Sequence, residues 1–297
     1  MVDRLGAMRV FARVARLESF SAASRELRIS TTAASRQVGE LEGHLGVKLL
    51  QRTTRRLRLT PVGADYLEQC ERVLSDVDEL EGRVRAGEAA VRGLLRVSAG
   101  VDLGREHLAP RLGAFMDAHP EVEVELSLSD RYVDLVADGF DLAIRTGPLG
   151  DSSLVARPLA TSWLATVASG GYLAAHGHPQ VPAELAAHSA ILDTNLRGGR
   201  FAFDTPSGVV RVSPRARLAI NSPIAARAFA IEGRGIAQVP HFLVAEALAA
   251  GELVSLFDDL PRGLLPIQAV YPARRHQSAR ARRYIEHCAV TFAGFEA

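Results

Sequence analysis

The stretch that decides the fold lies near the N-terminus, where residues 19–46 read SFSAASRELRISTTAASRQVGELEGHLG. Apolar residues recur in its second half at intervals of four, three and four, which predicts a helix with one buried stripe. Ser30 is a favourable N-cap for this helix, and Gly46 is a favourable stop. The stripe consists of Ala34, Val38, Leu41 and Leu45, and the opposite face carries Thr32, Ser35, Arg36 and Gly39. This second face is small, polar and basic, so it is suited to entering a groove.

Two shorter helices and a hairpin surround this helix. Apolar residues at helical spacing (Met8, Phe11, Val14 and Ala15) predict the first helix, and residues 21–27 predict the second. Residues 49–59 have the alternation of a strand pair, and a hairpin tip falls at Thr53-Thr54-Arg55-Arg56. The tip is strongly cationic.

A long helix follows the hairpin. Thr60 is a good cap, and Pro61 stands at the first helical position, which is a strong start signal. The predicted helix runs to about residue 91. A heptad pattern of apolar residues is formed by Cys70, Val77, Val84 and Val91, with Val73, Leu80 and Gly87 between them. A helix with one such seam is expected to pair with a partner helix.

Beyond Gly93 the pattern changes to alternating strands and helices. Strands are predicted at residues 94–98, 122–128, 140–145, 154–159, 163–168, 190–193, 217–221, 235–240 and 265–271, with helices at 108–118 and 278–295. This order is typical of an α/β fold. About 200 residues exceed one comfortable core, so we expect two α/β lobes.

Charge is divided between these regions. The whole chain has 35 basic and 34 acidic side chains, a net charge of +1. Residues 1–60 hold 12 basic and 5 acidic side chains, net +7, while residues 61–297 hold 23 basic and 29 acidic, net −6. The local excess of positive charge predicts a nucleic-acid partner for the N-terminal region alone.

Several other classes of protein are not indicated. The two cysteines, Cys70 and Cys288, allow at most one disulfide, and a buried structural thiol is the expected role of Cys70. The chain shows no signal peptide and no apolar run of membrane-spanning length, so a cytoplasmic protein is expected. His176 and His178 lack a neighbouring carboxylate or cysteine, and no catalytic or phosphate-binding motif is present. We therefore predict no metal, no cofactor and no catalytic residue.

Eleven segments in fixed order closely resemble the LysR-type transcriptional regulators. At the N-terminal end they are SFSAA at 19–23, LRISTTAASRQV at 27–38, LE at 41–42, LGVKLL at 45–50, RTTRRL at 52–57 and LTPVG at 59–63. Further along they are LAP at 108–110, HP at 119–120, DLV at 134–136, GFDLAIR at 139–145 and GIA at 235–237. The resemblance covers nearly the whole chain.

The resemblance implies an α+β multidomain protein. Its expected parts are a winged helix-turn-helix (1–60), a linker and dimerisation helix (61–92) and a two-lobed α/β sensor similar to periplasmic binding proteins (93–297). Lobe 1 would span about 93–160 and 267–297, and lobe 2 about 161–266. Such regulators assemble as homodimers or homotetramers through linker residues that match Val73, Val77, Leu80 and Val84. They bind interrupted palindromes in double-stranded DNA, as two-fold protein symmetry requires.

The expected DNA contacts gather on the helix-turn-helix and the wing. A recognition helix presents hydrogen-bonding groups of its first turns to base edges, and arginines at a wing favour phosphate or a narrow minor groove. The predicted residues are Ser21, Ser30, Thr31, Thr32, Ser35, Arg36, Arg52, Arg55 and Arg56. Relatives often carry Gln and Pro where Thr31 and Thr32 stand, and a merely polar first turn is the alternative for these two residues.

The resemblance also implies an effector cleft between the lobes. The loop after the strand at 94–98 precedes a helix, and free backbone N–H groups there favour an anion. These N–H groups predict a carboxylate ligand, although Asp102 would repel one. Effectors of similar regulators are typically small organic acids or aromatic compounds, so the resemblance implies an effector of this kind. The predicted effector-binding residues are Ser98, Ala99, Gly100, Val101, Arg145, Thr146, Gly147, Asn221 and Ser222.

Each effector residue has a structural alternative. Ser98 would then only cap a helix, Arg145 would pair with Asp141, and Asn221 would satisfy the backbone of a turn. Two other classes of function remain for the α/β region, a solute receptor for transport and an enzyme that uses the cleft. The absent signal peptide and the fused winged helix disfavour the first, and the absent catalytic motifs disfavour the second.

Overall fold

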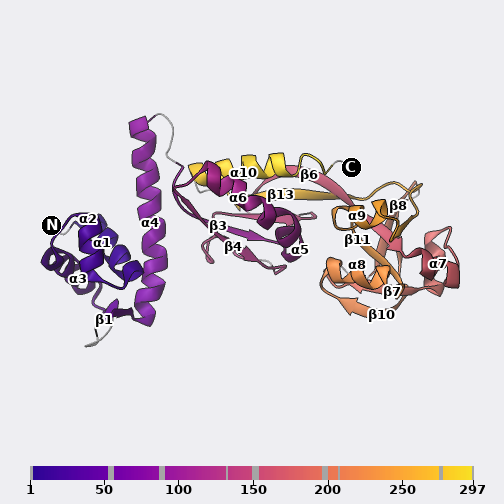
Figure 1. Ribbon diagram of the computed structural model, residues 1–297, viewed down its shortest axis with the longest axis horizontal. Helices are drawn as coiled ribbons and strands as arrows, with labels where there is room; N and C mark the ends of the chain where they lie inside the picture. Colours follow the sequence, from indigo (N-terminus) through magenta and orange to yellow (C-terminus); the bar gives the residue numbers. More distant parts are fainter. Residues whose placement is uncertain are drawn as a thin grey trace. The chain divides into compact units, whose positions relative to one another are not determined.

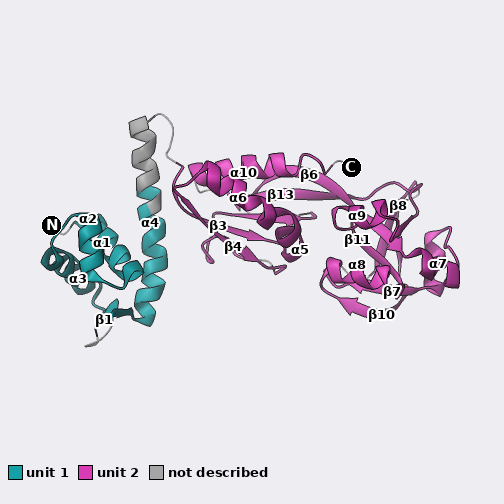
Figure 2. Ribbon diagram, viewed as in Figure 1, with its two compact units in different colours: residues 1–90 teal, residues 91–297 magenta. Residues whose placement is uncertain are grey.

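The computed structural model describes residues 3–52, 57–86, 91–131, 133–148, 154–195, 200–206, 208–273 and 277–295. The chain forms two compact units, Met1–Ala90 (unit 1) and Val91–Ala297 (unit 2), which Figure 2 shows in different colours. Among the described helices, none is both long and apolar enough to cross a lipid bilayer. Each unit has its own hydrophobic core.

Unit 1 is built on three helices that pack on one another. They are α1 (Arg4–Leu17), α2 (Phe20–Leu27) and α3 (Thr31–Leu45). The predicted residues Phe11 and Val14 of α1 are fully buried, as are Ala34, Val38 and Leu41 of α3. Leu45 differs from the prediction, because it is 36% exposed and Glu42 takes the last buried position of the helix.

A short hairpin and a long helix complete unit 1. Strand β1 (Leu50–Arg52) pairs antiparallel with β2 (Leu57–Leu59), and α4 (Pro61–Ala86) follows. The Thr60 hydroxyl accepts a hydrogen bond from the Gly63 N–H at 2.9 Å, so Thr60 is the predicted cap. A Cβ on Gly63 would lie only 2.0 Å from the Leu49 carbonyl oxygen, so only glycine allows α4 to approach the hairpin this closely.

Unit 2 contains one continuous sheet. Its described strands follow the order β10-β7-β11-β6-β13-β5-β3-β4, and β12 also pairs with β6. Strands β3, β4 and β5 are mutually parallel, as are β7, β10 and β11, whereas β13 runs antiparallel to both β5 and β6. The strands are β3 (Gly93–Ala99), β4 (Val122–Leu128), β5 (Leu142–Thr146), β6 (Leu154–Ala168), β7 (Ser189–Asp193), β10 (Arg215–Ile220), β11 (Ile236–Pro240), β12 (Val254–Leu256) and β13 (Leu264–Pro272).

Two strands belong to both halves of this sheet, and they divide unit 2 into two lobes. In lobe 1, β13 lies between β5 and the first part of β6, and in lobe 2 the last residues of β6 pair with β11 (Figure 1). The sequence predicted two strands at 154–159 and 163–168, but β6 is one strand of 15 residues. The two-lobed α/β fold is thus confirmed, with its lobes joined by crossing strands.

Helices cover both lobes. Lobe 1 carries α5 (Val101–Leu103), the π-helical turn Gly104–Leu108, α6 (Ala109–Ala118) and α10 (Ala279–Thr291). Lobe 2 carries α7 (Gly170–His176), α8 (Pro223–Ile231), α9 (Ala245–Ala249) and the 3-10 helices Pro182–Ala187 and His241–Leu243. A separate hairpin of β8 (Phe201–Thr205) and β9 (Gly208–Val212) was not predicted.

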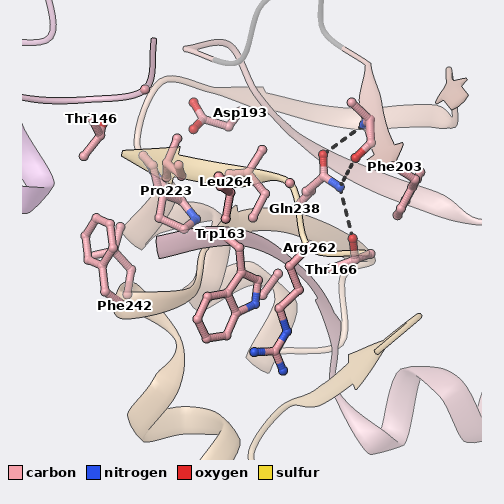
Figure 3. A pocket seen from close by; sticks show the side chains of 18 of the residues that line it. Thr146, Trp163, Thr166, Asp193, Phe203, Pro223, Gln238, Phe242, Arg262 and Leu264 are labelled. Carbon is pink, nitrogen blue, oxygen red and sulfur yellow. Dashed lines mark hydrogen bonds between the residues drawn. The ribbon is translucent and has the colours of Figure 1, made fainter. Parts of the chain in front are cut away.

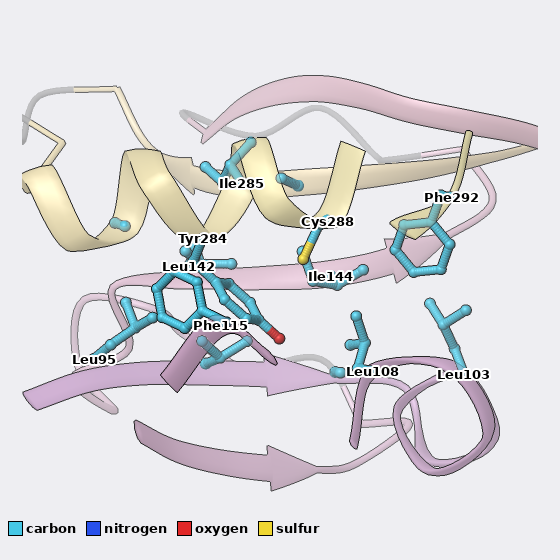
Figure 4. Close-up of a cluster of buried hydrophobic side chains, with 14 of the residues drawn as sticks. Leu95, Leu103, Leu108, Phe115, Leu142, Ile144, Tyr284, Ile285, Cys288 and Phe292 are labelled. Carbon is cyan, nitrogen blue, oxygen red and sulfur yellow. The ribbon is translucent and has the colours of Figure 1, made fainter. Parts of the chain in front are cut away.

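The core of lobe 1 lies between the sheet and helices α6 and α10. Phe115, Tyr284 and Phe292 are fully buried there among aliphatic side chains of β3 and β5 (Figure 4). Val91, the predicted end of the linker helix, packs against this core instead and is not helical. The helix as described ends at Ala86. Lobe 1 therefore begins at or before Val91.

Candidate functional site

The N-terminal turn of α3 presents an exposed polar face. Thr31, Thr32 and Arg36 are exposed, Ser35 is half-buried, and the buried stripe lies on the other side of the helix. The Arg36 side chain is 72% exposed and lies 3.7 Å from the carboxylate of Glu40 one turn later, an exposed pair that contributes little to stability. The guanidinium is therefore available to another partner.

Two serines of the predicted DNA set lie at the starts of helices. The Ser30 hydroxyl accepts a hydrogen bond from the Ala33 N–H at 3.0 Å, which makes Ser30 the N-cap of α3. Ser21 is exposed in the first turn of α2, with its hydroxyl 3.1 Å from that of the N-cap Ser19.

The predicted cationic hairpin tip falls outside the described residues. Arg55 and Arg56 lie there, and Arg52 is the last residue of β1, although its side chain is not described. Arg58 in β2 is exposed, opposite Gln51 of β1. The strands that carry the tip are in place beside α3.

A buried carboxylate fastens this hairpin to α3. Glu42 is only 7% exposed, and its carboxylate accepts hydrogen bonds from the N–H groups of Leu49 and Leu50, both at 3.0 Å, and from Lys48 Nζ at 2.6 Å. Burial alone would raise the pKa of Glu42, but these hydrogen bonds outweigh it and lower the pKa below its ordinary value. Sequence reasoning missed this residue, because its helical position gives no sign of the strand it holds.

The predicted dimerisation seam is partly exposed. Val73 of α4 is 44% exposed and Val77 is half-buried, while the side chains of Leu80 and Val84 lie outside the description. Cys70 does not belong to this seam, because its side chain is buried in the core of unit 1 with Sγ 3.6 Å from the Met8 carbonyl oxygen. Burial raises the pKa of Cys70 to about 12, so it is the predicted structural thiol rather than a reactive one.

Unit 2 encloses a cavity of about 660 Å³ between its two lobes. Lobe 1 contributes residues of α5 and the loop before it, of β5 and of β13, and lobe 2 contributes residues of β6, β7, β8, β11 and the segment after β12. The lining is both apolar and charged, and Figure 3 shows part of it. This volume is in the range of small-molecule sites.

Four of the nine predicted effector residues line this cavity, and five do not. Gly100, Arg145, Thr146 and Gly147 are among the lining residues, whereas Ser98, Ala99, Val101, Asn221 and Ser222 are not. Ser98 does not line the cavity itself, but it contacts a residue that does. The fully buried Ser98 hydroxyl accepts a hydrogen bond from Arg145 Nη2 at 2.8 Å, so it positions a lining residue. Asp141, the alternative partner of Arg145, instead pairs with Arg280 at 3.4 Å.

The expected anion site at the start of α5 is already occupied. The Val101 N–H donates to the Asp130 carboxylate at 2.9 Å. The prediction of free N–H groups there is therefore wrong at Val101, because a carboxylate 29 residues further along the chain fills the place of an effector anion.

The start of α8 is occupied in the same way, from the opposite lobe. The Ser222 hydroxyl and the Ile224 N–H both donate to Asp102 Oδ2 at 3.1 Å. Because Asp102 lies in α5 of lobe 1 and α8 lies in lobe 2, these two hydrogen bonds tie the lobes together at the cavity edge. Ser222 also caps α8 by accepting a hydrogen bond from the Ala225 N–H at 3.3 Å.

The only tryptophan of the chain lines the cavity between two partners. The Trp163 ring is stacked on His241 with centroids 3.8 Å apart, and Arg262 lies over the Trp163 ring at 4.2 Å (Figure 3). Burial and the nearby Arg262 charge lower the pKa of His241, so this ring is neutral at neutral pH. Because Trp163 lines the cavity, its fluorescence can report changes there.

Gln238 joins the hairpin β8–β9 to the main sheet. Its amide nitrogen donates to Thr166 Oγ1 at 3.2 Å and to the Ala202 carbonyl at 3.1 Å, and its oxygen accepts from the Ala202 N–H at 3.1 Å (Figure 3). The residue is buried and its hydrogen bonds reach β6 and β8, so it shapes the wall of the cavity rather than presenting free groups.

Asp193, at the end of β7, is the most deeply buried acid of the lining. It is only 3% exposed, and its Oδ1 accepts a hydrogen bond from the Asn195 N–H at 2.9 Å. Burial raises the pKa of Asp193 to about 6 against that hydrogen bond, and the charges of Asp130 and Asp102 add to the rise. Neither Asp193 nor Trp163 was predicted to bind effector, since nothing in their local sequence marks the cavity.

Comparison with known families covers both units. Residues 5–64 match the bacterial regulatory helix-turn-helix protein family of the lysR type, and residues 88–293 match the LysR substrate binding domain. The chain belongs to the LysR family. The helix-turn-helix match runs from the second residue of α1 to beyond β2, and the second match contains the whole cavity.

Relatives in the LysR family resemble the chain from end to end. The uncharacterized HTH-type transcriptional regulator YhjC of Escherichia coli is 37% identical over 288 residues, which cover 96% of each chain. An HTH-type transcriptional repressor of Pseudomonas aeruginosa is 36% identical over 298 residues, with 98% of this chain and 93% of the relative covered. The structure of CrgA, a LysR-type transcriptional regulator from Neisseria meningitidis, matches with a TM-score of 0.62 and 32% identity over 96% of this chain and 97% of that one.

These matches establish the function at the level of the family. The chain is a LysR-type DNA-binding transcriptional regulator that combines a helix-turn-helix with a substrate-binding domain. The relatives are regulators, and no family of enzymes is indicated.

Proposed function

We propose that this LysR-type regulator contacts DNA through the first turns of α3 and the hairpin tip. The proposed contact residues are Ser21, Ser30, Thr31, Thr32, Ser35, Arg36, Arg52, Arg55 and Arg56. The observation that carries the proposal is the exposed face of α3, where Thr31, Thr32 and Arg36 project from a helix whose other side is buried. The net charge of +7 in residues 1–60 supplies the attraction to phosphate.

We also propose that α4 pairs two copies of the chain through Val73, Val77, Leu80 and Val84. The exposed Val73 supports this pairing, because an apolar side chain on a long helix is stabilised by a partner helix. A homodimer of this kind, or a tetramer of two dimers, would read an interrupted palindrome in double-stranded DNA.

The cavity of unit 2 is the proposed effector site. Its walls come from both lobes, so a bound small molecule would favour one arrangement of the lobes over another. The hydrogen bonds from Ser222 and Ile224 to Asp102 span the same boundary, and their geometry would change with that arrangement. Gly100, Arg145, Thr146 and Gly147 remain the proposed contacts from the predicted set.

The DNA contact is tested by comparing Arg36→Ala with Arg283→Ala on DNA from upstream of the regulator's own gene. Both arginines are exposed and lie beside a glutamate of the same helix, Glu40 at 3.7 Å and Glu286 at 3.0 Å, so the two variants lose the same charge from similar settings. We expect Arg36→Ala to weaken binding about tenfold or more, because one base or phosphate contact contributes about 1–3 kcal/mol. Arg283→Ala should bind as the wild type does.

Footprinting separates the possible outcomes of this comparison. Protection of an upstream site that is lost in Arg36→Ala and kept in Arg283→Ala supports the proposed face. Equal affinities of all three proteins would contradict it. A loss that is uniform over all DNA sequences assigns Arg36 to phosphate, and a loss confined to the operator assigns it to a base edge.

A further inference from the structure

The acid end of the cavity is built from both lobes. Asp102 and Asp130 come from lobe 1, Asp193 comes from lobe 2, and all three line the cavity. Asp102 and Asp130 are already engaged, because each accepts a hydrogen bond from the first turn of a helix. The two helix starts that would attract an effector carboxylate are thus filled by the protein's own carboxylates.

Asp193 differs from these two acids, because no helix start among the described residues donates a hydrogen bond to its carboxylate. Within the part of the chain that the structure describes, its carboxylate accepts one hydrogen bond, at Oδ1 from the Asn195 N–H, and no arginine or lysine pairs with it. Only 3% of the surface of Asp193 is exposed, so bulk water does little to stabilise the charge of its carboxylate. A buried carboxylate with a single hydrogen-bond donor is costly for the folded protein.

Two neighbouring negative charges also disfavour the ionised form of Asp193. The carboxylates of Asp130 and Asp102 repel the charge of Asp193, and with burial they raise the pKa of Asp193 to about 6. Near neutral pH the group is nevertheless mostly ionised. A cation placed beside it would be attracted by all three carboxylates at once.

The cavity also offers apolar surface for a carbon skeleton. Phe242, Pro223 and Leu264 line it together with Trp163 (Figure 3). Two of the lining arginines have partners within the protein, since Arg145 donates to Ser98 and Arg262 lies over the Trp163 ring. Positive charge is also present nearby, because Arg200 and Arg211 line the cavity and Arg105 lies 3.6 Å from the Asp102 carboxylate.

We propose that the effector of this regulator is a small organic amine, whose protonated amino group binds Asp193 while its carbon skeleton packs on the apolar wall. The proposal rests on the proposed function of the cavity and narrows the chemical class of its ligand. The ammonium group donates to the carboxylate of Asp193 in lobe 2 and faces the carboxylates of Asp102 and Asp130 in lobe 1. An amine therefore connects the lobes by electrostatic attraction and stabilises the closed arrangement.

Trp163 fluorescence in the full-length protein tests this assignment, because it is the only tryptophan and it lines the cavity. The probes are two pairs with matched skeletons, benzylamine against benzoate and butylamine against butyrate, titrated near neutral pH. We expect benzylamine to change the fluorescence with saturation and to bind more tightly than benzoate. Butylamine should likewise bind more tightly than butyrate.

Two variants locate the amino group. Asp193→Asn keeps the size of the side chain and its acceptor for the Asn195 N–H, so it removes the charge alone. Asp117→Asn is the matched control, because Asp117 is an exposed acid of α6 that does not line the cavity. We expect amine affinity to fall about tenfold or more in Asp193→Asn, which corresponds to about 1.4 kcal/mol, and to stay unchanged in Asp117→Asn. Thermal unfolding of both variants checks that they are folded.

The proposal is overturned by any of three results. They are tighter binding of the carboxylates than of the amines, full amine affinity in Asp193→Asn, or no saturable response of Trp163 to either amine. In the first case the cavity would still be an effector site, so the proposed sensing role would survive the loss of the amine assignment. Failure of the proposed DNA contact is seen separately, in the footprints of Arg36→Ala.

Discussion

Two buried carboxylates, one in each unit, have opposite surroundings. Glu42 in unit 1 is 7% exposed and receives three hydrogen bonds, from Lys48, Leu49 and Leu50. Asp193 in unit 2 is 3% exposed and receives one, from Asn195, among the described residues. The pKa of Glu42 is lowered in spite of burial, whereas burial raises the pKa of Asp193 to about 6.

The difference separates a structural acid from one that is free to bind a ligand. The donors around Glu42 stabilise its charge and hold the hairpin beside α3, so the carboxylate contributes to the fold of unit 1. Asp193 is buried with a single hydrogen bond among the described residues, so its charge is stabilised less well than that of Glu42. Strongly shifted carboxylates in clefts occur often at functional sites, and this one lies in the cavity.

The largest expected effect is on the stability of unit 1, when Glu42 is replaced. Glu42→Ala leaves the buried N–H groups of Leu49 and Leu50 without their acceptor. We expect a loss of about 4 kcal/mol in the free energy of unfolding of unit 1, since each unsatisfied group costs about 1–3 kcal/mol. Denaturant unfolding of the full-length variant, followed by circular dichroism, measures it. A loss no greater than that of an exposed substitution such as Glu40→Ala would show that the hydrogen bonds are not structural.

The next effect concerns Asp193 and depends on pH. Its pKa is raised from 3.8 to about 6 by folding, so the native state binds the proton more tightly and stability falls as the pH rises through this window. Asp193→Asn has no carboxylate at this position, so the variant does not lose stability in this pH range through Asp193. Above pH 6 the variant should therefore be more stable than the wild type, by about 3 kcal/mol, and below about pH 4 the two should differ little.

Thermal unfolding of both proteins across this pH range measures the effect. A variant that is less stable than the wild type at every pH would show that the charge of Asp193 is stabilised within the protein. That result would remove the contrast with Glu42, because both acids would then be structural.

Much of the fold could be predicted from the sequence because local signals agree with it. The periodic stripe at Ala34, Val38 and Leu41, the cap at Thr60 and the alternation of strands and helices all correspond to the structure. Predictions from the sequence were wrong where a segment distant in the chain decides how a residue or strand packs. Cys70 follows the heptad pattern but packs on α1, and β6 is one strand because β13 and β11 pair along its length.

The effector site could be predicted only in part, for the same reason. Arg145, Thr146 and Gly147 lie in a motif that the family resemblance marks, and they line the cavity. The bond from Asp130 to Val101 N–H and those from Ser222 and Ile224 to Asp102 join residues 29 to 122 positions apart. No local pattern shows that these carboxylates accept hydrogen bonds at the helix starts, so the sequence did not show that the Val101 N–H is already bonded to Asp130.

The central claim is that Asp193 keeps a buried, incompletely bonded carboxylate for a cationic ligand. The most direct measurement is a carboxyl-carbon NMR titration of Asp193 in the full-length protein, assigned by difference from Asp193→Asn, with and without benzylamine. We predict a pKa near 6 for the free protein and a lower pKa with the amine, because an ammonium group stabilises the ionised form. A pKa near the ordinary value of 3.8 that does not move when benzylamine is added would contradict the claim.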